Sequence, residues 1–308
     1  MMTNDRVTNQ ATWQSSHVVT PTEAGVTVRE LLSLWLIPKR LQHYLRVRQD
    51  VLVNAKYRPY SMPVAAGDHV TLTVRADELQ TPLQAYEPDE RMSIPVLFEN
   101  DDLVVIDKPT GVKSHPNQAG ERGTVMNYLT TQLAPQGVAP AMVHRLDMAT
   151  SGAMIVAKNP LVVPILDRLI SDKRIDRTYV AWVAGHFDHQ TGAFSDAIGR
   201  DPDDKRKRML DGERPQTALT HYEVLDETPT ATLVQLTLAT GRTHQLRVHL
   251  AGNGHAILGD PLYANREEQE RAPRLMLHAR RLNLLVPFTG QRTTVTAPLP
   301  PDFATFTG

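Results

Sequence analysis

One short polar stretch, His144 to Gly152, places three reactive side chains within four residues. They are the imidazole of His144, the guanidinium of Arg145 and the carboxylate of Asp147. Apolar runs flank the stretch, so the sequence predicts a turn between two strands. Thr150 and Gly152 suit that turn, because a hydroxyl can bond nearby backbone and glycine can adopt positive φ. A carboxylate in such a turn often only caps backbone amides, so the rest of the chain must decide whether Asp147 reacts.

A second polar concentration, residues 239–249, contains the histidine pair His244 and His249. Their spacing puts the rings on opposite faces of a strand, or about 140° apart on a helix. The pair is therefore unsuited to a metal, and we expect no metal site. The sequence also lacks the glycine patterns of nucleotide and dinucleotide sites, so we expect no cofactor. A serine-hydrolase elbow, Gly-x-Ser-x-Gly, is absent as well.

With metal, cofactor and serine-hydrolase chemistry excluded, chemistry by a carboxylate remains. A glycosidase would need two carboxyl groups about 5–10 Å apart, whereas the polar motifs offer one prominent acid, Asp147, among arginines. A carboxylate beside a guanidinium stays ionised. An ionised carboxylate suits a nucleophile better than a proton donor.

The composition limits where and how the chain can work. Its 308 residues contain no cysteine, which excludes disulfides, thiolate nucleophiles and Cys-ligated metal clusters and fits a reducing compartment. The amino terminus lacks the apolar core of a secretory signal. No run approaches the roughly 20 apolar residues of a membrane helix. We therefore expect a soluble, cytoplasmic protein without a membrane partner.

The first quarter of the chain has the pattern of a small basic domain. Apolar residues recur at helical spacing over 26–36 and 39–47, and strands are expected at 51–54 and 70–74. Residues 26–76 carry eight Lys and Arg against three Asp and Glu. Such charge attracts RNA phosphates, although an ordinary solvated helix face would carry similar residues. The candidate phosphate contacts are Lys39, Arg40, Arg46 and Arg48.

The remainder of the chain alternates predicted strands and helices. An acidic, proline-containing segment, residues 77–93, reads as a linker. Residues 202–215 read as a charged loop that is either solvated or in contact with RNA. Strands are expected at 96–98, 103–106, 177–183, 217–225 and 231–238, and helices at 124–133 and 161–170.

Five sequence blocks together resemble the RluA family of pseudouridine synthases. His144 to Gly152 matches the family pattern His-Arg-Leu-Asp-x-x-Thr-Ser-Gly at every fixed position. The resemblance extends over about residues 94–290. The amino-terminal segment, with its two helices and the sequence Val-Leu-Val-Asn, resembles the αL RNA-binding module that many members carry. The other matching blocks are Asp107–Pro109 with His115 and Pro116, Arg177–Tyr179 with Gly185, Gly241–His249, and Leu277–Ala279.

The resemblance implies an α+β protein with the pseudouridine synthase fold. Its central sheet would be mixed and mostly antiparallel with flanking helices, and a small amino-terminal α/β RNA-binding domain would precede it. The implied division is a frayed terminus at 1–14, an αL-type module at 15–76, the acidic linker at 77–93, and a catalytic domain at 94–308.

The implied activity is isomerisation of uridine to pseudouridine in RNA, without a cofactor and by a protein that we expect to be a monomer. Large-subunit ribosomal RNA is the favoured substrate, because family members acting on it commonly carry the module. Transfer RNA is the alternative substrate. The competing class is a non-catalytic RNA-binding or ribosome-assembly protein on the same fold.

Three residues would then carry the reaction. Asp147 would attack either the uracil ring or the anomeric carbon, after which the base detaches, rotates and rejoins through its carbon 5. Tyr179 would stack on the base and assist the final proton removal. Arg242 would pair with Asp147 and keep it ionised.

Four further residues would face the substrate. Arg145 would displace the target uridine from its stack, because the enzyme must flip the base to reach it. Met148 and Leu246 would line the pocket. His144 belongs to the same group, with its ring expected to act as a hydrogen-bonding group rather than a general base.

Overall fold

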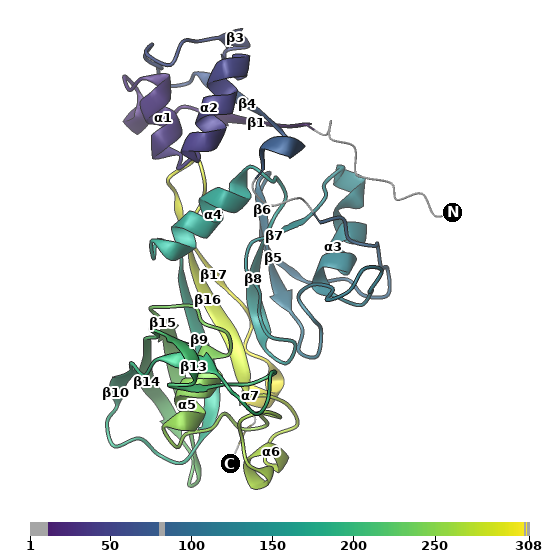
Figure 1. The fold of residues 1–308 in the computed structure, drawn as a ribbon, viewed down its shortest axis with the longest axis vertical. Coiled ribbons are helices and arrows are strands. Elements are labelled where there is room, and N and C mark those ends of the chain that lie inside the picture. The colour runs from purple at the N-terminus through teal and green to yellow at the C-terminus, as the bar shows by residue number, and fades with distance from the viewer. Residues whose placement is uncertain (1–11, 80–83, 305, 307–308) are drawn as a thin grey trace.

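The computed structural model describes residues 12–79, 84–304 and 306. The chain forms a small amino-terminal module and a larger body built on one long sheet (Figure 1). Helices flank the strands in both parts, so the predicted α+β class is confirmed.

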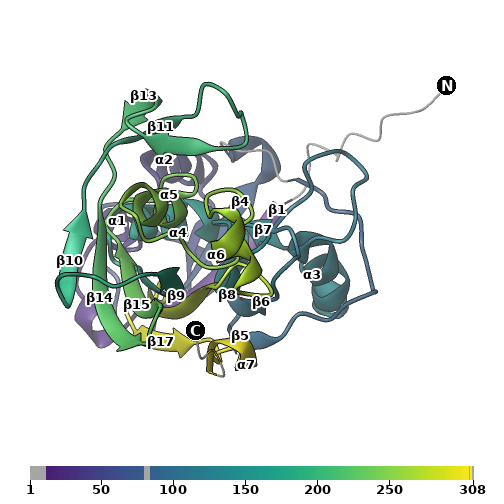
Figure 2. The ribbon, with the colours of Figure 1, turned by 90° about the horizontal axis from the view of Figure 1, so that it is seen from below.

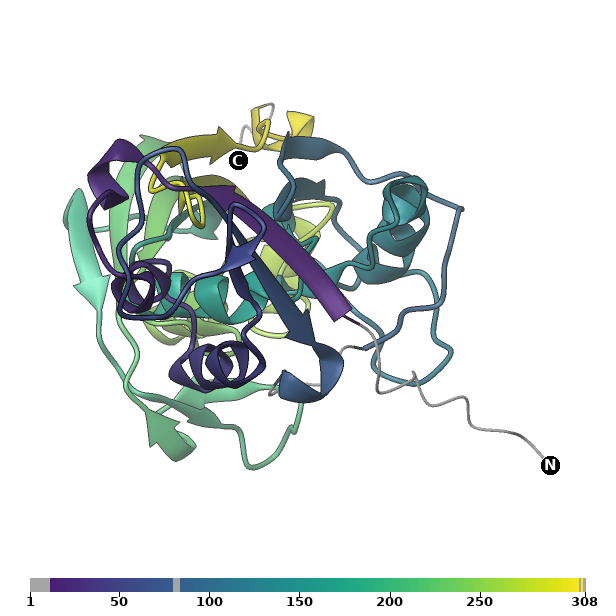
Figure 3. The same cartoon turned by 90° about the horizontal axis from the view of Figure 1, so that it is seen from above.

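The module pairs two helices with a four-stranded sheet in the order β1-β4-β2-β3. Its helices lie side by side next to β1 and β4 (Figure 3). The elements are β1 (Thr12–Val18), η1 (Pro21–Glu23), α1 (Val28–Leu34), α2 (Lys39–Arg48), β2 (Val51–Val53), β3 (Lys56–Tyr57), β4 (His69–Arg75) and η2 (Ala76–Glu78).

Local sequence accounts for both module helices. Thr27 caps α1, since its hydroxyl accepts the amide of Glu30 while the Glu30 carboxylate accepts the amide of Thr27. Helix α2 ends where Gln49 turns into the left-handed region. One boundary was wrong: β1 begins at Thr12 and pairs with β4 from there, so residues 12–14 are not frayed. The rest of the predicted terminus, residues 1–11, lies outside the described residues.

The larger body contains a ten-stranded sheet. The path through it runs β10-β14-β15-β9-β16-β8-β6-β5, and β17 and β7 pair with β16 and β8. The elements are β5 (Val96–Glu99), β6 (Leu103–Lys108), α3 (Val125–Leu133), η3 (Ala134–Gln136), β7 (Ala141–Met142), β8 (Ser151–Ala157), α4 (Val162–Ser171), β9 (Asp176–Ala184), β10 (Thr191–Phe194), β11 (Ile198–Arg200), β12 (Arg208–Leu210), β13 (Glu213–Gln216), β14 (Thr220–Glu227), β15 (Ala231–Leu238), α5 (Gln245–Gly252), α6 (Arg266–Glu270), β16 (Leu277–Leu285), β17 (Arg292–Thr296) and α7 (Pro301–Ala304).

This sheet is mixed and mostly antiparallel, as predicted. Among its described pairings only β16 with β8 is parallel. Seen from below, α5 lies near β14 and α3 lies beside β5 and β6 (Figure 2). Strand β8 is buried at every position, which explains the continuous apolar sequence after the polar turn.

The second half of the predicted charged loop at 202–215 is instead part of a second, three-stranded sheet in the order β12-β11-β13, whereas residues 202–207 form the expected loop. Gly199 and Gly212 allow two of its strands to meet, because a Cβ on Gly199 would lie 2.3 Å from the carbonyl carbon of Gly212. Leu210 packs with Ile198 and Val248 in a small apolar cluster. The segment is therefore structured rather than merely solvated.

The module and the body share one hydrophobic core. The hairpin between β16 and β17 reaches the module (Figure 1). At its tip, Phe288 stacks on His17 with ring centroids 3.5 Å apart and meets Trp35 edge-on at 5.4 Å. Ser15 of β1 lies 3.5 Å from the carboxylate of Asp102 in the body. The module is therefore packed against the body and is not an independent domain joined only by a linker.

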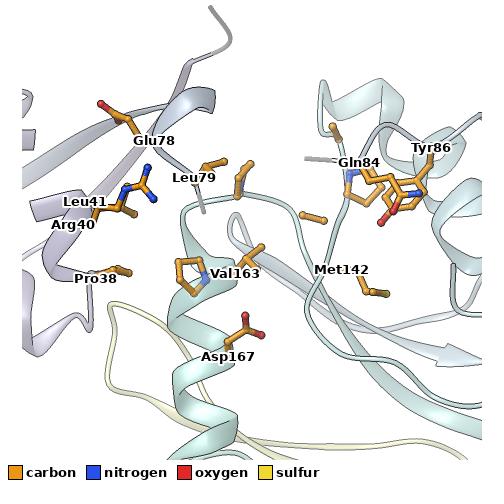
Figure 4. Close-up of a pocket in the computed structure, with 15 residues that line it drawn as sticks. Pro38, Arg40, Leu41, Glu78, Leu79, Gln84, Tyr86, Met142, Val163 and Asp167 are labelled. Carbon is orange, nitrogen blue, oxygen red and sulfur yellow. The ribbon is translucent and has the colours of Figure 1, made fainter. Parts of the chain in front are cut away.

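A cavity of about 250 Å³ lies along this seam (Figure 4). Its lining is largely apolar, with Leu41 from the module, Leu79 from the linker and Val163 from α4.

Candidate active site

A polar cavity of about 390 Å³ brings the predicted catalytic residues together. Its volume falls within the roughly 300–1,000 Å³ of small-molecule sites. Asp147, Tyr179 and Arg242 all line it, together with Arg145 and Leu246. The remaining lining residues are Leu146, Thr150, Arg177, Arg208, Leu238, Gly241, Thr243, His244, Gln245, Arg247 and Leu277.

Asp147 lies in the turn between β7 and β8, and a neighbouring segment, residues 108–114, holds that turn by its backbone. The Ser114 hydroxyl donates to the carbonyl of Leu146 at 2.7 Å and accepts the Leu146 amide at 3.2 Å. The Gly111 amide donates to the carbonyl of Met148 at 2.9 Å. The Thr110 hydroxyl donates to the next carbonyl, at 2.8 Å. Hydrogen bonds on both sides of Asp147 thus fix its position.

Lys108 adds a buried cation to this arrangement. Its side chain is fully buried at the end of β6, and its ammonium nitrogen lies 2.9 Å from the Pro109 carbonyl and 3.1 Å from the Met148 carbonyl. Burial lowers the pKa of Lys108 to about 7, although the charge of Asp147 opposes the shift. Charged or neutral, the amine can donate to both carbonyls.

Gly152, at the end of the turn, is required because β8 and β16 approach each other closely there. Gly152 has φ +109°, and a Cβ there would lie 2.3 Å from the carbonyl oxygen of Ala279 on β16. The predicted positive φ at this glycine is confirmed. Only glycine lets β8 begin directly against β16.

The guanidinium that pairs with Asp147 is that of Arg247. Its Nη1 donates to Oδ2 of Asp147 at 3.1 Å. The other side of the same guanidinium donates twice to Asp260, at 2.7 and 2.6 Å. Asp260 is fully buried and also accepts the amides of Leu262 and Tyr263. A buried carboxylate thus orients the cation toward Asp147.

The guanidinium of Arg247 remains protonated. Burial alone would lower the pKa of Arg247, but the carboxylates of Asp260 and Asp147 outweigh burial and hold it above the usual value. A permanent cation therefore lies 3.1 Å from Oδ2 of Asp147 and fixes that oxygen by a charge-assisted hydrogen bond. Oδ1 of Asp147 accepts no hydrogen bond from the described residues, so it is free to meet a substrate.

Arg242 does not make the predicted pair with Asp147. Its Nε donates to the carbonyl of Thr217 at 3.0 Å, and its backbone amide donates to Gln245. Arg242 precedes α5, whereas Arg247 lies one turn inside the helix on its buried side. The same sequence block therefore contains the partner, but five residues later than expected.

Tyr179 lies on β9 with only 5% of its surface exposed. Burial raises the pKa of the phenol, as does the charge of Asp147, while Arg177 opposes the shift. The phenol therefore keeps its proton at neutral pH while facing the cavity.

Of the four residues predicted to face the substrate, two line the cavity and two do not. Arg145 is exposed at the cavity, and Leu246 is buried in its wall. Met148 is 52% exposed beside the turn but does not line the cavity. His144 lies behind the turn, where its Nε2 accepts the amide of Ile155 at 3.0 Å. His144 thus holds backbone and is turned away from the cavity lining.

The cavity is strongly cationic. Besides Arg247, four arginines line it, and among the described residues none of the four has a carboxylate within ion-pair distance. A uracil ring is neutral, so these cations suit the phosphates that flank a target nucleotide. The four are Arg145, Arg177, Arg208 and Arg242.

In the module, three of the four predicted phosphate contacts are exposed on α2. Lys39, Arg40 and Arg46 face solvent. The fourth, Arg48, was misassigned as a surface cation. Its guanidinium donates to Asp50 at 2.6 Å and to the carbonyl of Thr73 at 2.7 Å, and it pairs with the buried Glu78. Arg48 therefore fastens the end of the module and is not free to bind phosphate.

Sequence reasoning missed Arg247 and Asp260. One signal was available: Arg247 interrupts an otherwise apolar helical run between Leu246 and Val248. An arginine on a buried helix face requires a carboxylate partner. The sequence spacing alone did not show that this partner would follow a tight turn 13 residues later.

Comparisons with known proteins agree with this site. A family model described as RNA pseudouridylate synthase matches residues 102–252. A second, described as the RluD ribosomal pseudouridine synthase N-terminal domain, matches residues 16–70. A ribosomal large subunit pseudouridine synthase D of Nitrosomonas europaea is 34% identical over 284 residues, covering 89% of this chain and 80% of that protein. An RNA pseudouridine synthase of Bacillus subtilis is 35% identical, covering 82% of this chain and 83% of that protein.

A solved structure shows the same fold. The human RNA pseudouridylate synthase domain containing 1 protein superimposes with a TM-score of 0.59 at 28% identity, covering 70% of this chain and 86% of that one. Within the described residues, no helix has the length and apolar character to cross a membrane.

Proposed function

Since the chain belongs to the RNA pseudouridylate synthase family and is an RNA pseudouridine synthase, we propose that it modifies large-subunit ribosomal RNA with Asp147 as its nucleophile. The substrate class rests on the relatives that are named for the large ribosomal subunit. Transfer RNA is the alternative substrate. We place the protein in the cytoplasm, as a monomer.

One observation carries the proposed mechanism: the two oxygens of Asp147 differ. Oδ2 is held by Arg247, whose other side is fixed by Asp260. Oδ1 accepts no hydrogen bond from the described residues and belongs to a side chain that lines the cavity. An oriented, ionised carboxylate with one free oxygen is the arrangement that nucleophilic attack requires.

The reaction moves one bond within the substrate. Oδ1 attacks the uracil ring or the anomeric carbon, the bond from nitrogen 1 to carbon 1′ breaks, and the base rotates within the cavity. Carbon 5 then bonds to carbon 1′. The proton lost from carbon 5 balances the proton gained by nitrogen 1, so no external reagent is consumed.

Tyr179 is suited to the proton step as a relay. Because its phenol is protonated at neutral pH, it can accept the carbon 5 proton only while passing its own proton on. We propose Asp147 as the acceptor, once its carboxylate is released. The same ring offers a flat surface on which the uracil can stack.

We propose that Arg145 and Met148 open the RNA. Both are exposed, and both flank Asp147 within the turn. A long cation and an apolar side chain beside the cavity can occupy the space that a flipped uridine leaves in its stack. The unpaired arginines at the cavity would hold the neighbouring phosphates.

The module would supply a second contact with the RNA. We propose that residues 15–76 form the RNA-binding domain and that Lys39, Arg40 and Arg46 contact phosphates. Their exposure on one helix and their lack of carboxylate partners in the described part of the chain support this assignment. Such contacts position the RNA but do not read its sequence.

Mapping of pseudouridine at nucleotide resolution tests the substrate. Ribosomal and transfer RNA would be compared between a strain that lacks the gene, the same strain with the wild-type gene, and one with Asp147→Asn. We expect a site in large-subunit RNA that is lost without the gene and restored only by the wild type. Restoration of a site in transfer RNA alone would contradict the proposed substrate.

A further inference from the structure

The three-stranded sheet β11–β13 touches the catalytic network at one defined place. The backbone amide of Arg208, the first residue of β12, donates to the phenol oxygen of Tyr263 at 2.9 Å. Leu210 packs on α5 so closely that a Cβ on Gly252 would lie 2.4 Å from its methyl group. The sheet is therefore seated on the helix that carries Arg247.

The phenol oxygen of Tyr263 lies 2.7 Å from Nδ1 of His244. That oxygen accepts the amide of Arg208, and the phenol can at the same time donate its own hydrogen to Nδ1. When the phenol donates in this way, the single proton of the neutral ring is on Nε2. Nε2 lies 3.7 Å from Oδ2 of Asp147, the same oxygen that Arg247 holds. This series of hydrogen bonds thus ends with the Nε2–H of His244 facing the carboxylate of Asp147.

Two further features of His244 fit a defined task. Its backbone is left-handed, with φ 58°, a conformation that is unfavourable for a residue other than glycine. Burial lowers the pKa of the ring, which keeps it neutral despite nearby carboxylates. The ring of Tyr263 also lies under the guanidinium of Arg247, whose Cζ is 5.0 Å from the centre of that ring. Tyr263 therefore touches both groups that face Oδ2.

We propose that His244 and Tyr263 are positioning residues through which the β11–β13 sheet sets the orientation of the Asp147 carboxylate. The proposal rests on the proposed function of Asp147. At 3.7 Å the approach of Nε2 is longer than a hydrogen bond, so a shift of less than 1 Å upon RNA binding would complete it. The charged segment that precedes β12 would then support the nucleophile as well as meet solvent.

Substitutions at His244 test the donor. His244→Leu removes it, whereas His244→Gln returns an N–H near the Nε2 position. We expect kcat to fall about 10- to 100-fold in His244→Leu, the usual effect of a misplaced reacting group, with KM within about twofold. His244→Gln should recover most of the loss. Equal losses in the two variants, or a rise in KM alone, would overturn the proposal.

The connection to the sheet is tested at Arg208 and Tyr263. Arg208→Pro removes the amide donor, and Arg208→Ala keeps it while removing the same side chain. We expect Arg208→Pro to have a lower kcat than Arg208→Ala, and Tyr263→Phe to abolish that difference, because groups in one chain are not additive. A difference that persists in the Tyr263→Phe background would contradict the connection. Tyr222→Phe, a phenol outside the network, serves as the unaffected control.

A measurement that does not depend on activity separates this proposal from the assignment of function. Ring ¹⁵N shifts of His244, assigned with His244→Gln, report which nitrogen carries the proton. We expect the Nε2–H form in wild type and a mixture in Tyr263→Phe. The Nδ1–H form in wild type would overturn the proposal even if pseudouridine is made. Wild type without activity but with the Nε2–H form would instead count against the proposed function.

Discussion

At the scale of single residues, the site depends on which arginine meets Asp147. A guanidinium that bridges two carboxylates has a fixed orientation, because N–H groups on two of its edges are hydrogen-bonded. Arg247 has that environment, with Asp147 on one side and the buried Asp260 on the other. Among the described residues, the Arg242 guanidinium donates to the carbonyl of Thr217 and has no carboxylate within ion-pair distance. We therefore propose that Arg247 positions the nucleophile and that Arg242 contacts RNA.

A matched pair of lysine substitutions tests this division. Arg247→Lys keeps the charge but cannot bridge both carboxylates, so we expect kcat to fall about 10- to 100-fold. Arg242→Lys should keep kcat within a few-fold, with any loss in KM. Steady-state kinetics on one RNA would measure both variants, with thermal melting as the control for folding. A larger loss of kcat in Arg242→Lys would reverse the assignment.

The buried amine of Lys108 gives a prediction in pH. Its pKa is about 7 in the folded chain, against 10.5 for an ordinary lysine. Between these values the unfolded chain binds the extra proton, so the contribution of Lys108 to stability increases as pH rises from 7 to 10.5 and is constant below 7. Urea unfolding of wild type and Lys108→Met should show a difference in stability that shifts in favour of wild type over that range. A difference independent of pH would show that the amine is not perturbed.

Much of this site was predicted from the sequence blocks that resemble the family. Asp147, Tyr179 and Arg145, which those blocks named, line one cavity, while their roles in the reaction remain predictions. The partner of Asp147 was not predicted correctly, because Arg242 and Arg247 occur in one block and only the helical phase of α5 separates them. His144 was grouped with the substrate, although its ring binds backbone, since a sequence cannot show which way a turn residue faces.

At the scale of elements, the catalytic turn is stable because other segments hold it. The segment 108–114 binds the carbonyls on both sides of Asp147, and β16 lies against Gly152. These contacts explain why the blocks Asp107–Pro109 and Leu277–Ala279 belong with the turn, although they lie far from it in sequence. The positions of local helices and strands were predicted well. The sheet β11–β13 was not, because its strands are only three or four residues long and show no period-two pattern.

Gly152→Ala tests the packing at this point. A Cβ would collide with the backbone of Ala279 and the residue would be held at φ +109°. We expect a loss of about 3 kcal/mol or more in the free energy of unfolding. Gly254→Ala is the matched control, since that glycine also has positive φ but open space around it, and it should lose only about 1–2 kcal/mol. Equal losses in the two variants would show that the close approach is unimportant.

At the scale of the whole molecule, the module and the body act as one unit. The stacking of His17 on Phe288 and the shared apolar core join them. Deletion of the module would expose this core, so point substitutions are the better probe of RNA binding. The shared core also explains why the sequence, read in segments, separated two domains that the structure packs together.

The exposed and the buried cations of α2 should behave differently. The triple variant Lys39→Ala, Arg40→Ala, Arg46→Ala removes three phosphate contacts, so the slope of log affinity against log salt should decrease by roughly 2–3. Arg48→Ala should leave the slope unchanged and reduce stability, since Asp50 and Glu78 lose their partner. Filter-binding titrations over a range of salt would measure the slopes. An unchanged slope in the triple variant would show that α2 does not bind RNA.

The central claim is that Asp147 performs the chemistry while other residues hold the RNA, and Asp147→Asn tests it most directly. The amide keeps the shape of the side chain but is not a nucleophile. Pseudouridine formation on transcribed RNA and RNA affinity would be measured on the same preparation. We predict that the variant forms no pseudouridine and binds RNA within a few-fold of wild type. Pseudouridine formation by Asp147→Asn at a rate near that of wild type would contradict the account.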